Sequence, residues 1–324
     1  MFLGVDGGGT KTALALIDRD GRVLAQHLTS AAHFVATGMD SVRSLLHAAV
    51  HTLLAKAAVP ASAIEFAFFG LPSYGEDSSL AAALDALPSG CLPEGRYRCG
   101  NDMVCGWSGS LGGVDGISVV AGTGSICYGE RGGMAARCGG WGELFSDEGS
   151  AYWIAIRGLN VYSRMSDGRL PRGPLHQLFN ARLALDHDLD LCARVYGEAG
   201  ADRSTLAQFS KLVHEAVVMG DQQAGAIFTQ AAEELAGLAD TTRQRLGYKA
   251  GEPVLVSYSG GVFANASAIL QPRFATALAA RWASYQLREP LLPPDIGAAL
   301  YAARIHRQPL AASAVERLRH KDQT

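Results

Sequence analysis

The chain has 324 residues, of which 48% are hydrophobic and 18% charged, and its formal net charge is −3. This length exceeds what one hydrophobic core usually organises, so we expect two domains, and the composition excludes a disordered chain. Lys and Arg (28) nearly balance Asp and Glu (31) and form no basic stripe, which argues against a nucleic-acid partner.

The sequence also argues against a membrane partner. No apolar run reaches the roughly 18 residues that a bilayer span needs. Asp6 and three glycines stand where a signal peptide needs an apolar segment. The six cysteines fall at irregular spacings that indicate neither a zinc site nor a disulfide framework. We therefore expect a cytoplasmic protein.

The first 28 residues predict three strands, at residues 2–6, 12–17 and 22–27. The loop Gly7-Gly8-Gly9-Thr10-Lys11 joins the first two strands, whereas Walker and dinucleotide loops join a strand to a helix. It is therefore neither of those two loops. Its backbone N–H groups and the Thr10 hydroxyl are typical of a cradle for an anion.

The same pattern recurs further along the chain. Residues 116–120 and 126–129 predict strands, and the loop Gly122-Thr123-Gly124-Ser125 lies between them. Two such hairpins indicate two related halves. Two anion cradles that face each other could hold a polyphosphate from both sides.

The remaining segments alternate between helices and strands, which indicates an α/β layered fold. Helices are predicted at 41–57, 78–87, 148–164, 204–219, 222–246, 295–306 and 311–320, and strands at 64–70, 96–99 and 253–258. The strand at 96–99 is followed by Gly100-Asn101-Asp102, and the last strand by Ser259-Gly260-Gly261.

These motifs resemble those of the sugar-kinase, actin and heat-shock ATPase superfamily, and within it the N-acetylglucosamine kinases and their BadF-type ATPase relatives. Residues 4–11 resemble the first phosphate loop of that superfamily, residues 121–125 the second, and residues 259–262 its adenosine loop. Residues 138–142 (CGGWG) and 146–153 (SDEGSAYW) are similar to a signature of the N-acetylglucosamine kinases. The four motifs occur in the order found in the family.

The resemblance implies two actin-like (ribonuclease H-like) domains, each a mixed sheet flanked by helices, around an interdomain cleft. We expect residues 1–112 and 294–324 to form one domain, with a returning C-terminal helix, and residues 113–293 to form the other. A homodimer is a common oligomeric state, which the sequence does not decide.

The resemblance also implies ATP and Mg²⁺ as cofactors. It assigns ATP binding to loop residues: Gly8, Gly9, Thr10, Lys11, Gly122, Thr123, Gly124, Gly260 and Gly261. Asp6 would hold hydrated Mg²⁺, a role suited to a hard oxygen ligand, and Asp102 would act as the general base on a sugar hydroxyl. A turn cap is the alternative reading of either aspartate, and Lys11 could equally be a solvated surface lysine.

The expected substrate is an amino sugar. The resemblance places His33, Asn101, Asp102, Cys138, Trp141 and Asp147 around it, with Cys138 in the acetamide pocket. Trp141 could instead be a core residue, and Asp147 could simply complement the dipole of the following helix. Two positions depart from the family pattern: His33 stands where an Asn is usual, and Ser146 where a Gly is usual. The first departure leaves hexose recognition open, and the second is closer to glucosamine kinases.

The sequence therefore predicts an ATP-dependent hexosamine kinase that phosphorylates the 6-hydroxyl of N-acetylglucosamine, with glucosamine as the second candidate substrate. An ATPase that activates a dehydratase or reductase is a different class in the same family, but it would need cysteines that converge on an iron–sulfur cluster. A nucleotide-binding regulator without catalysis is a third class, against which Asp102 argues.

Overall fold

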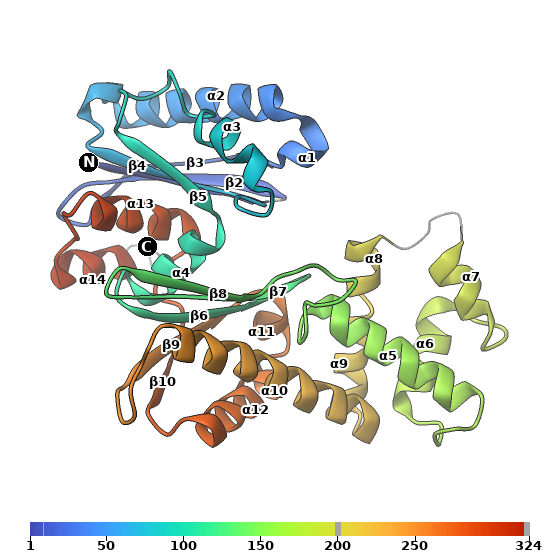
Figure 1. The fold of residues 1–324 in the computed structure, drawn as a ribbon. Helices are drawn as coiled ribbons and strands as arrows, with labels where there is room; N and C mark the ends of the chain where they lie inside the picture. Colours follow the sequence, from blue (N-terminus) through green and yellow to red (C-terminus); the bar gives the residue numbers. More distant parts are fainter. Residues whose placement is uncertain (9, 198–201, 321–324) are drawn as a thin grey trace. The chain divides into compact units, whose positions relative to one another are not determined.

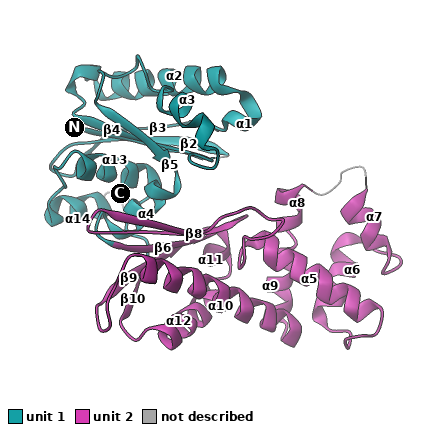
Figure 2. Ribbon diagram, in the orientation of Figure 1, with its two compact units in different colours: residues 1–115, 288–324 teal, residues 116–287 magenta. Residues whose placement is uncertain are grey.

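The computed structural model describes residues 1–8, 10–197 and 202–320 (Figure 1). The chain forms two compact units (Figure 2). Unit 1 contains residues 1–115 and the chain from residue 288 onward, and unit 2 contains residues 116–287.

Unit 1 is built on a five-stranded mixed sheet. Its strands are β1 (Phe2–Gly7), β2 (Lys11–Ile17), β3 (Val23–Ser30), β4 (Phe66–Leu71) and β5 (Tyr97–Asn101), in the order β3-β2-β1-β4-β5. β1, β4 and β5 run parallel, and β2 is antiparallel to both β1 and β3. Its α-helices are α1 (Phe34–Thr37), α2 (Met39–Ala57), α3 (Ala81–Asp85), α4 (Met103–Leu111), α13 (Pro294–Ile305) and α14 (Ala312–His320), with short 3₁₀ turns at Ala61–Ala63 and Ser78–Leu80.

Helices cover both faces of this sheet (Figure 1). Alternate strand residues such as Leu14 and Leu16 are fully buried in one core with Leu46 and Leu53 of α2. On the other face α13 packs directly on β1 at Gly4, where a side chain would collide with the backbone of the helix. The parallel strands therefore end between two helical layers.

Unit 2 repeats the sheet with different helices. Its strands are β6 (Gly116–Ala121), β7 (Ser125–Arg131), β8 (Met134–Gly139), β9 (Val254–Ser259) and β10 (Tyr285–Arg288), in the order β10-β9-β6-β7-β8. Its helices are α5 (Ala151–Ser166), α6 (Pro174–Leu183), α7 (Asp190–Tyr196), α8 (Arg203–Ala207), α9 (Ser210–Val218), α10 (Gln222–Arg245), α11 (Gly261–Asn265) and α12 (Ser267–Arg281).

The two sheets share one topology, in which β6 to β10 correspond in chain order to β1 to β5. The antiparallel pairs β6–β7 and β7–β8 match β1–β2 and β2–β3. The parallel pair β6–β9 matches β1–β4. Helix α10 packs across β6, β7 and β8. Helices α5 to α9 form a helical cluster beside the sheet (Figure 1). The two predicted related halves, each with a glycine loop in its first hairpin, are confirmed.

Two predicted helices differ from the structure. The helix predicted at 204–219 is two helices, α8 and α9, because tight turns at Gln208 and Phe209 interrupt it and Phe209 packs on Phe179 with ring centroids 5.7 Å apart. The helix predicted at 78–87 is a 3₁₀ turn followed by the five-residue α3. The helices predicted around α2, α5, α10, α13 and α14 are confirmed with small shifts of their ends.

Candidate active site

The first glycine loop joins β1 to β2 in unit 1. The backbone N–H of Gly8 donates to the carbonyl of Lys11 at 2.9 Å, which closes the loop. Thr10 and Lys11 are exposed, so the hydroxyl and the ammonium group are accessible to a ligand. Gly9, which the sequence also assigns to ATP binding, lies outside the described residues.

Asp6 stands one residue before the end of β1, opposite Ala13 of β2 and Gly70 of β4. Burial, together with the negative charges of Asp102 and Asp295, raises the pKa of its carboxyl to about 7, while a hydrogen bond with Cys105 and the Lys11 ammonium oppose the shift. The carboxyl groups of Asp102 and Asp295 therefore both lie near Asp6 in unit 1.

This environment fits a divalent cation. A half-buried carboxylate with acidic neighbours gains stabilisation from a cation, and Mg²⁺ binds proteins through one or two carboxylates while it keeps several waters. The described residues form no group of three or more His, Cys, Asp or Glu side chains that could enclose a metal ion. The acidic surroundings of Asp6 are compatible with a hydrated cation that takes one ligand from the protein, and the assignment of Mg²⁺ to Asp6 stays a prediction.

Asp102 follows β5 and is the N-cap residue of α4. Its backbone N–H donates to the carbonyl of Leu71 at 3.3 Å, and its carbonyl accepts from Cys105 at 2.9 Å. At Gly70 a Cβ would collide with the Cys105 thiol and lie 3.1 Å from the Asp102 Cα. Glycine at this position therefore lets the start of α4 approach β4.

Asn101 and His33 both make hydrogen bonds to local backbone. The Asn101 side chain accepts from the N–H of Met103 and donates to the carbonyl of Tyr74, both at 3.0 Å, so it anchors the start of α4. His33 is half-buried and precedes α1. Its carbonyl accepts from the N–H groups of the next turn. The predicted contacts of Asn101 and His33 with a sugar stay predictions.

Asp295 was not among the predicted site residues. It lies in the first turn of α13, is 7% exposed, and accepts a hydrogen bond from Nε2 of Gln26 at 2.9 Å. In the sequence it follows two prolines at a helix start, where an acidic residue is ordinary. Only the packing of α13 on β1 brings it near Asp6.

The second glycine loop joins β6 to β7 in unit 2. Its Gly122 N–H donates to the carbonyl of Gly124 at 2.8 Å. The carbonyls of Gly122 and Thr123 accept from the N–H groups of Ala151 and Tyr152 in the first turn of α5. The loop is therefore fixed against the positive end of a 16-residue helix, while the side chain of Thr123 stays exposed.

A pocket of about 370 Å³ opens beside this loop. It is lined by Gly122, Thr123, Ala151, Ala207, Gln208, Ser210, Lys211, His214, Phe228, Gly261, Val262, Asn265 and Ala266. Two of the predicted ATP loops, the second phosphate loop and the adenosine loop, thus line one cavity of unit 2. Gly260 precedes it at φ 99°, where a Cβ would collide with the backbone of Ala121.

The polar residues that helices add to this pocket were not predicted. Lys211 and His214 come from α9, Gln208 from the turn before it, and Asn265 from the end of α11. Polar residues are ordinary in a turn and on the outer face of an amphipathic helix, so the sequence carries no signal that separates these four from surface residues.

The loop between β8 and α5 carries the other predicted sugar-binding residues. Trp141 is 73% exposed, so it is not a core residue, and its role as a platform for the sugar stays a prediction. Cys138 is half-buried and its thiol interacts with Thr241 of α10. Asp147 is 2% exposed, with its carboxylate paired to Arg203 of α8 and 3.4 Å from the N–H of Ser125.

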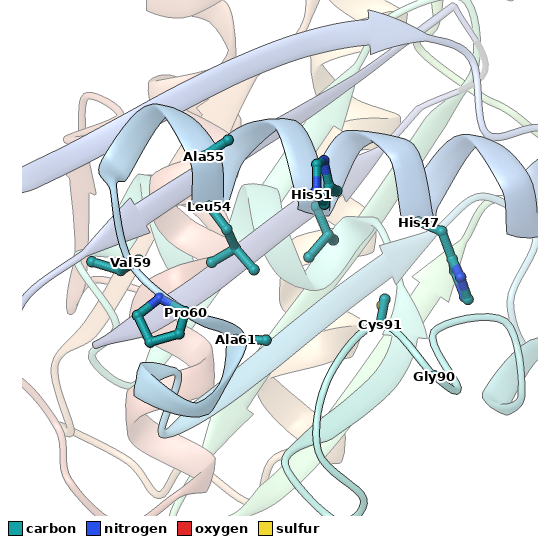
Figure 3. A pocket seen from close by; sticks show the side chains of 10 residues that line it. His47, His51, Leu54, Ala55, Val59, Pro60, Ala61, Gly90 and Cys91 are labelled. Atoms are coloured by element: carbon teal, nitrogen blue, oxygen red, sulfur yellow. The ribbon is translucent and has the colours of Figure 1, made fainter.

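Unit 1 holds a cavity of about 530 Å³ whose lining includes none of the predicted site residues (Figure 3). It lies between α2, the turn that follows α2 and the loop at residue 90, and is lined by His47, Val50, His51, Leu54, Ala55, Val59, Pro60, Ala61, Gly90 and Cys91. His47 Nε2 lies 3.1 Å from the carbonyl of Leu87, and the Cys91 thiol donates to the carbonyl of Pro88. Both side chains are thus tied to nearby backbone.

Comparison with known proteins decides the family. The model of the BadF/BadG/BcrA/BcrD ATPase family matches residues 3–302, which is nearly the whole chain. The chain belongs to the BadF/BadG/BcrA/BcrD ATPase family. The match confirms the predicted resemblance, and the two mixed five-stranded sheets confirm the predicted actin-like fold.

Individual relatives of this BadF-family chain match it over most of its length. An N-acetyl-D-glucosamine kinase of Dictyostelium discoideum is 26% identical over 314 residues, which are 93% of this chain and 97% of the relative. An N-acetylmuramic acid/N-acetylglucosamine kinase of Clostridium acetobutylicum is 28% identical over 267 residues, or 81% and 85% of the two chains.

A solved structure from Chromobacterium violaceum is similar over the same range. It is 26% identical, superposes with a TM-score of 0.68, and the match covers 92% of this chain and 97% of the other.

Among the described residues, no helix combines the length and apolar character needed to cross a membrane.

Proposed function

We propose that this BadF-family protein is an ATP-dependent hexosamine kinase that transfers the γ-phosphate of ATP to the 6-hydroxyl of N-acetylglucosamine. The observation that carries the proposal is the placement of Asp102, whose carboxylate at the end of β5 is close enough to Asp6 to raise the pKa of that group. This carboxylate near the candidate metal ligand supports the proposal that Asp102 acts as the base. The two kinase relatives support the substrate class.

The site residues divide the work of the transfer. The N–H groups and hydroxyls of Thr10 and Thr123 would hold the phosphates, and Lys11 would contribute a positive charge. Asp6 would hold Mg²⁺, which when bound neutralises charge on the phosphate oxygens. The pocket lined by Thr123 and Gly261 would take the nucleoside part of ATP.

Asp102 would perform the proton transfer. Its carboxylate would accept the proton of the 6-hydroxyl as that oxygen forms a bond to the γ-phosphorus. The bond between the γ-phosphorus and the oxygen that bridges to the β-phosphate breaks, and ADP leaves with that electron pair. An aspartate suits this task because the hydroxyl needs alignment and a proton acceptor only while the new bond forms.

Glucosamine is the second candidate substrate, and Ser146 favours it. The Ser146 hydroxyl interacts with the Glu148 carboxylate at 3.2 Å, and Glu143 lies in the same loop. Acidic side chains near the sugar would attract the ammonium group of glucosamine and not the neutral acetamide of N-acetylglucosamine.

A panel of hexoses and hexosamines tests the substrate. ADP release is measured with Mg²⁺ and ATP, with and without each sugar. We expect the largest stimulation with N-acetylglucosamine. If no sugar raises ADP release above background, the kinase proposal is wrong. If glucosamine alone stimulates ADP release, the substrate is glucosamine and not N-acetylglucosamine.

Asp102→Asn tests the mechanism. We expect kcat to fall by about 10²- to 10⁴-fold, because the amide cannot accept the proton, while ATP binding measured by calorimetry changes little. Asp40→Asn is the matched control, since Asp40 is exposed at the start of α2, and it should keep full activity. Retention of kcat in Asp102→Asn would exclude Asp102 as the base.

A further inference from the structure

Arg203 is the first residue of α8, and its guanidinium reaches the loop that precedes α5. One terminal N–H donates to the Asp147 carboxylate. The Nε atom lies 3.4 Å from the Glu143 carboxylate but makes no hydrogen bond within the described residues. Two acidic side chains thus contact one guanidinium.

The arginine and Asp147 lie directly against the second phosphate loop. A Cβ on Gly124 would collide with the Arg203 guanidinium and would lie 2.7 Å from a carboxylate oxygen of Asp147. Glycine at this position therefore makes room for the ion pair. If this loop holds the terminal phosphate, as proposed, the sugar that receives the phosphate binds close to the loop, and Arg203 and Asp147 are side chains that pack on it.

Exposure separates the two members of the ion pair. The Asp147 side chain is 3% exposed, whereas the Arg203 side chain is 38% exposed. Burial raises the pKa of Asp147, and the Arg203 charge opposes that shift. The ionised form of Asp147 is therefore stabilised by the arginine. Of the two, Arg203 is the group that presents polar atoms to solvent, and a guanidinium has five N–H donors.

We propose that Arg203 binds the sugar directly, by donating hydrogen bonds to its 3- or 4-hydroxyl oxygen, and that Asp147 acts as the positioning residue for the guanidinium. The inference rests on the proposed hexosamine kinase function and revises the part that the sequence assigns to Asp147. A planar guanidinium suits the role because it can contact Asp147 and Glu143 and still offer donors on its open edge.

The test compares Arg203→Gln with wild type on N-acetylglucosamine and on its 3-deoxy and 4-deoxy analogues. A site that donates to a hydroxyl discriminates against the analogue that lacks it. We expect wild type to lose at least tenfold in kcat/KM on one of these analogues. On the parent sugar, the kcat/KM of Arg203→Gln should be at least tenfold below that of wild type. The change to that same analogue should lower the kcat/KM of Arg203→Gln little further. The KM of the variant for ATP should stay within twofold of the wild-type value.

Two further variants complete the test. Asp147→Asn should lower kcat/KM on the parent sugar by about the same factor as Arg203→Gln. The double variant should lower it by no more than either single variant, because the two side chains act as one unit. Arg182→Gln is the matched control: Arg182 is an exposed arginine of α6 paired with Glu215, and its variant should behave as wild type. Arg203→Lys keeps the positive charge and serves as a second variant in case Arg203→Gln fails to fold. We expect its kcat/KM to lie between those of Arg203→Gln and wild type.

Each contrary outcome has a distinct meaning. If Arg203→Gln and wild type lose the same factor on every analogue, Arg203 does not contact the sugar and the inference is wrong. A rise of the KM for ATP with no effect on the sugar would assign Arg203 to the phosphates and would also overturn it. Failure of wild type to turn over any sugar would refute the proposed function itself.

Discussion

Asp6 is a residue whose placement opposes the stability of the ligand-free protein. Its carboxyl is half-buried in unit 1 with Asp102 and Asp295 as acidic neighbours, and its pKa is raised to about 7. Such an arrangement costs free energy whenever all three groups are ionised. A bound cation would offset that cost, which is consistent with selection for function at this position.

A pH series tests this environment. The raised pKa means that folded Asp6 holds its proton more tightly than the unfolded chain does. Its stabilising contribution is therefore complete below about pH 4 and is lost as the pH rises through 7. We expect metal-free Asp6→Asn to gain on the order of 3 kcal/mol over wild type between pH 4 and pH 8, because the amide has no charge to bury.

Urea unfolding in the presence of a chelator measures this difference at several pH values. Asp40→Asn, at an exposed carboxyl, serves as the control and should show no such trend. A stability difference between Asp6→Asn and wild type that does not change with pH would show that Asp6 is ionised in both states.

Helix α4 is the element that places Asp102, and it packs on α13 through glycines. A Cβ on Gly109 would lie 2.8 Å from the carbonyl oxygens of Leu292 and Pro293, and a Cβ on Gly297 would collide with the backbone of α4. Close contact of the two helices therefore requires small residues at their crossing. The same contact holds the first turn of α4, and with it Asp102, at the end of β5.

Two alanine substitutions on α4 separate this packing from helix propensity. Gly109→Ala should destabilise the protein by about 1 to 3 kcal/mol, because the new methyl group meets backbone that cannot move aside. Gly106→Ala should instead stabilise it by about 0.5 to 1 kcal/mol, since nothing lies within 4 Å of that Cβ. Thermal unfolding measures both, and equal effects would contradict the packing explanation.

At the scale of the whole molecule, the proposed reaction draws on both units. Asp6, Thr10 and Asp102 belong to unit 1, whereas Thr123 and Arg203 belong to unit 2. Each unit holds its own glycine loop on the same strand topology. Transfer to a sugar and not to water requires that water be excluded from the terminal phosphate, and domain closure is the usual means.

Small-angle scattering tests for such closure. We expect the radius of gyration to decrease when N-acetylglucosamine and a non-hydrolysable ATP analogue are both present, and Asp102→Asn should compact in the same way because it retains binding. Calorimetry under the same conditions establishes that the ligands are bound. An unchanged radius with both ligands bound would argue against closure.

Much of the local structure was predictable from the sequence by itself. The glycine loops, the strand-end position of Asp102 and the periodic helices α2 and α10 follow from signals within short segments. Backbone geometry at a tight loop requires glycine, and a helix face repeats every three to four residues, so both leave a local trace. The order of these signals also predicted two related α/β halves.

Only the tertiary structure decided which distant residues meet. Arg203 pairs with Asp147 across 56 positions, and α13 returns from the end of the chain to bring Asp295 near Asp6. The pocket beside the second phosphate loop likewise combines Lys211 and His214 with Gly261. Such contacts depend on how helices pack on the two sheets, and an arginine, a lysine or an aspartate on a helix has the same local sequence signal whether it faces a ligand or solvent.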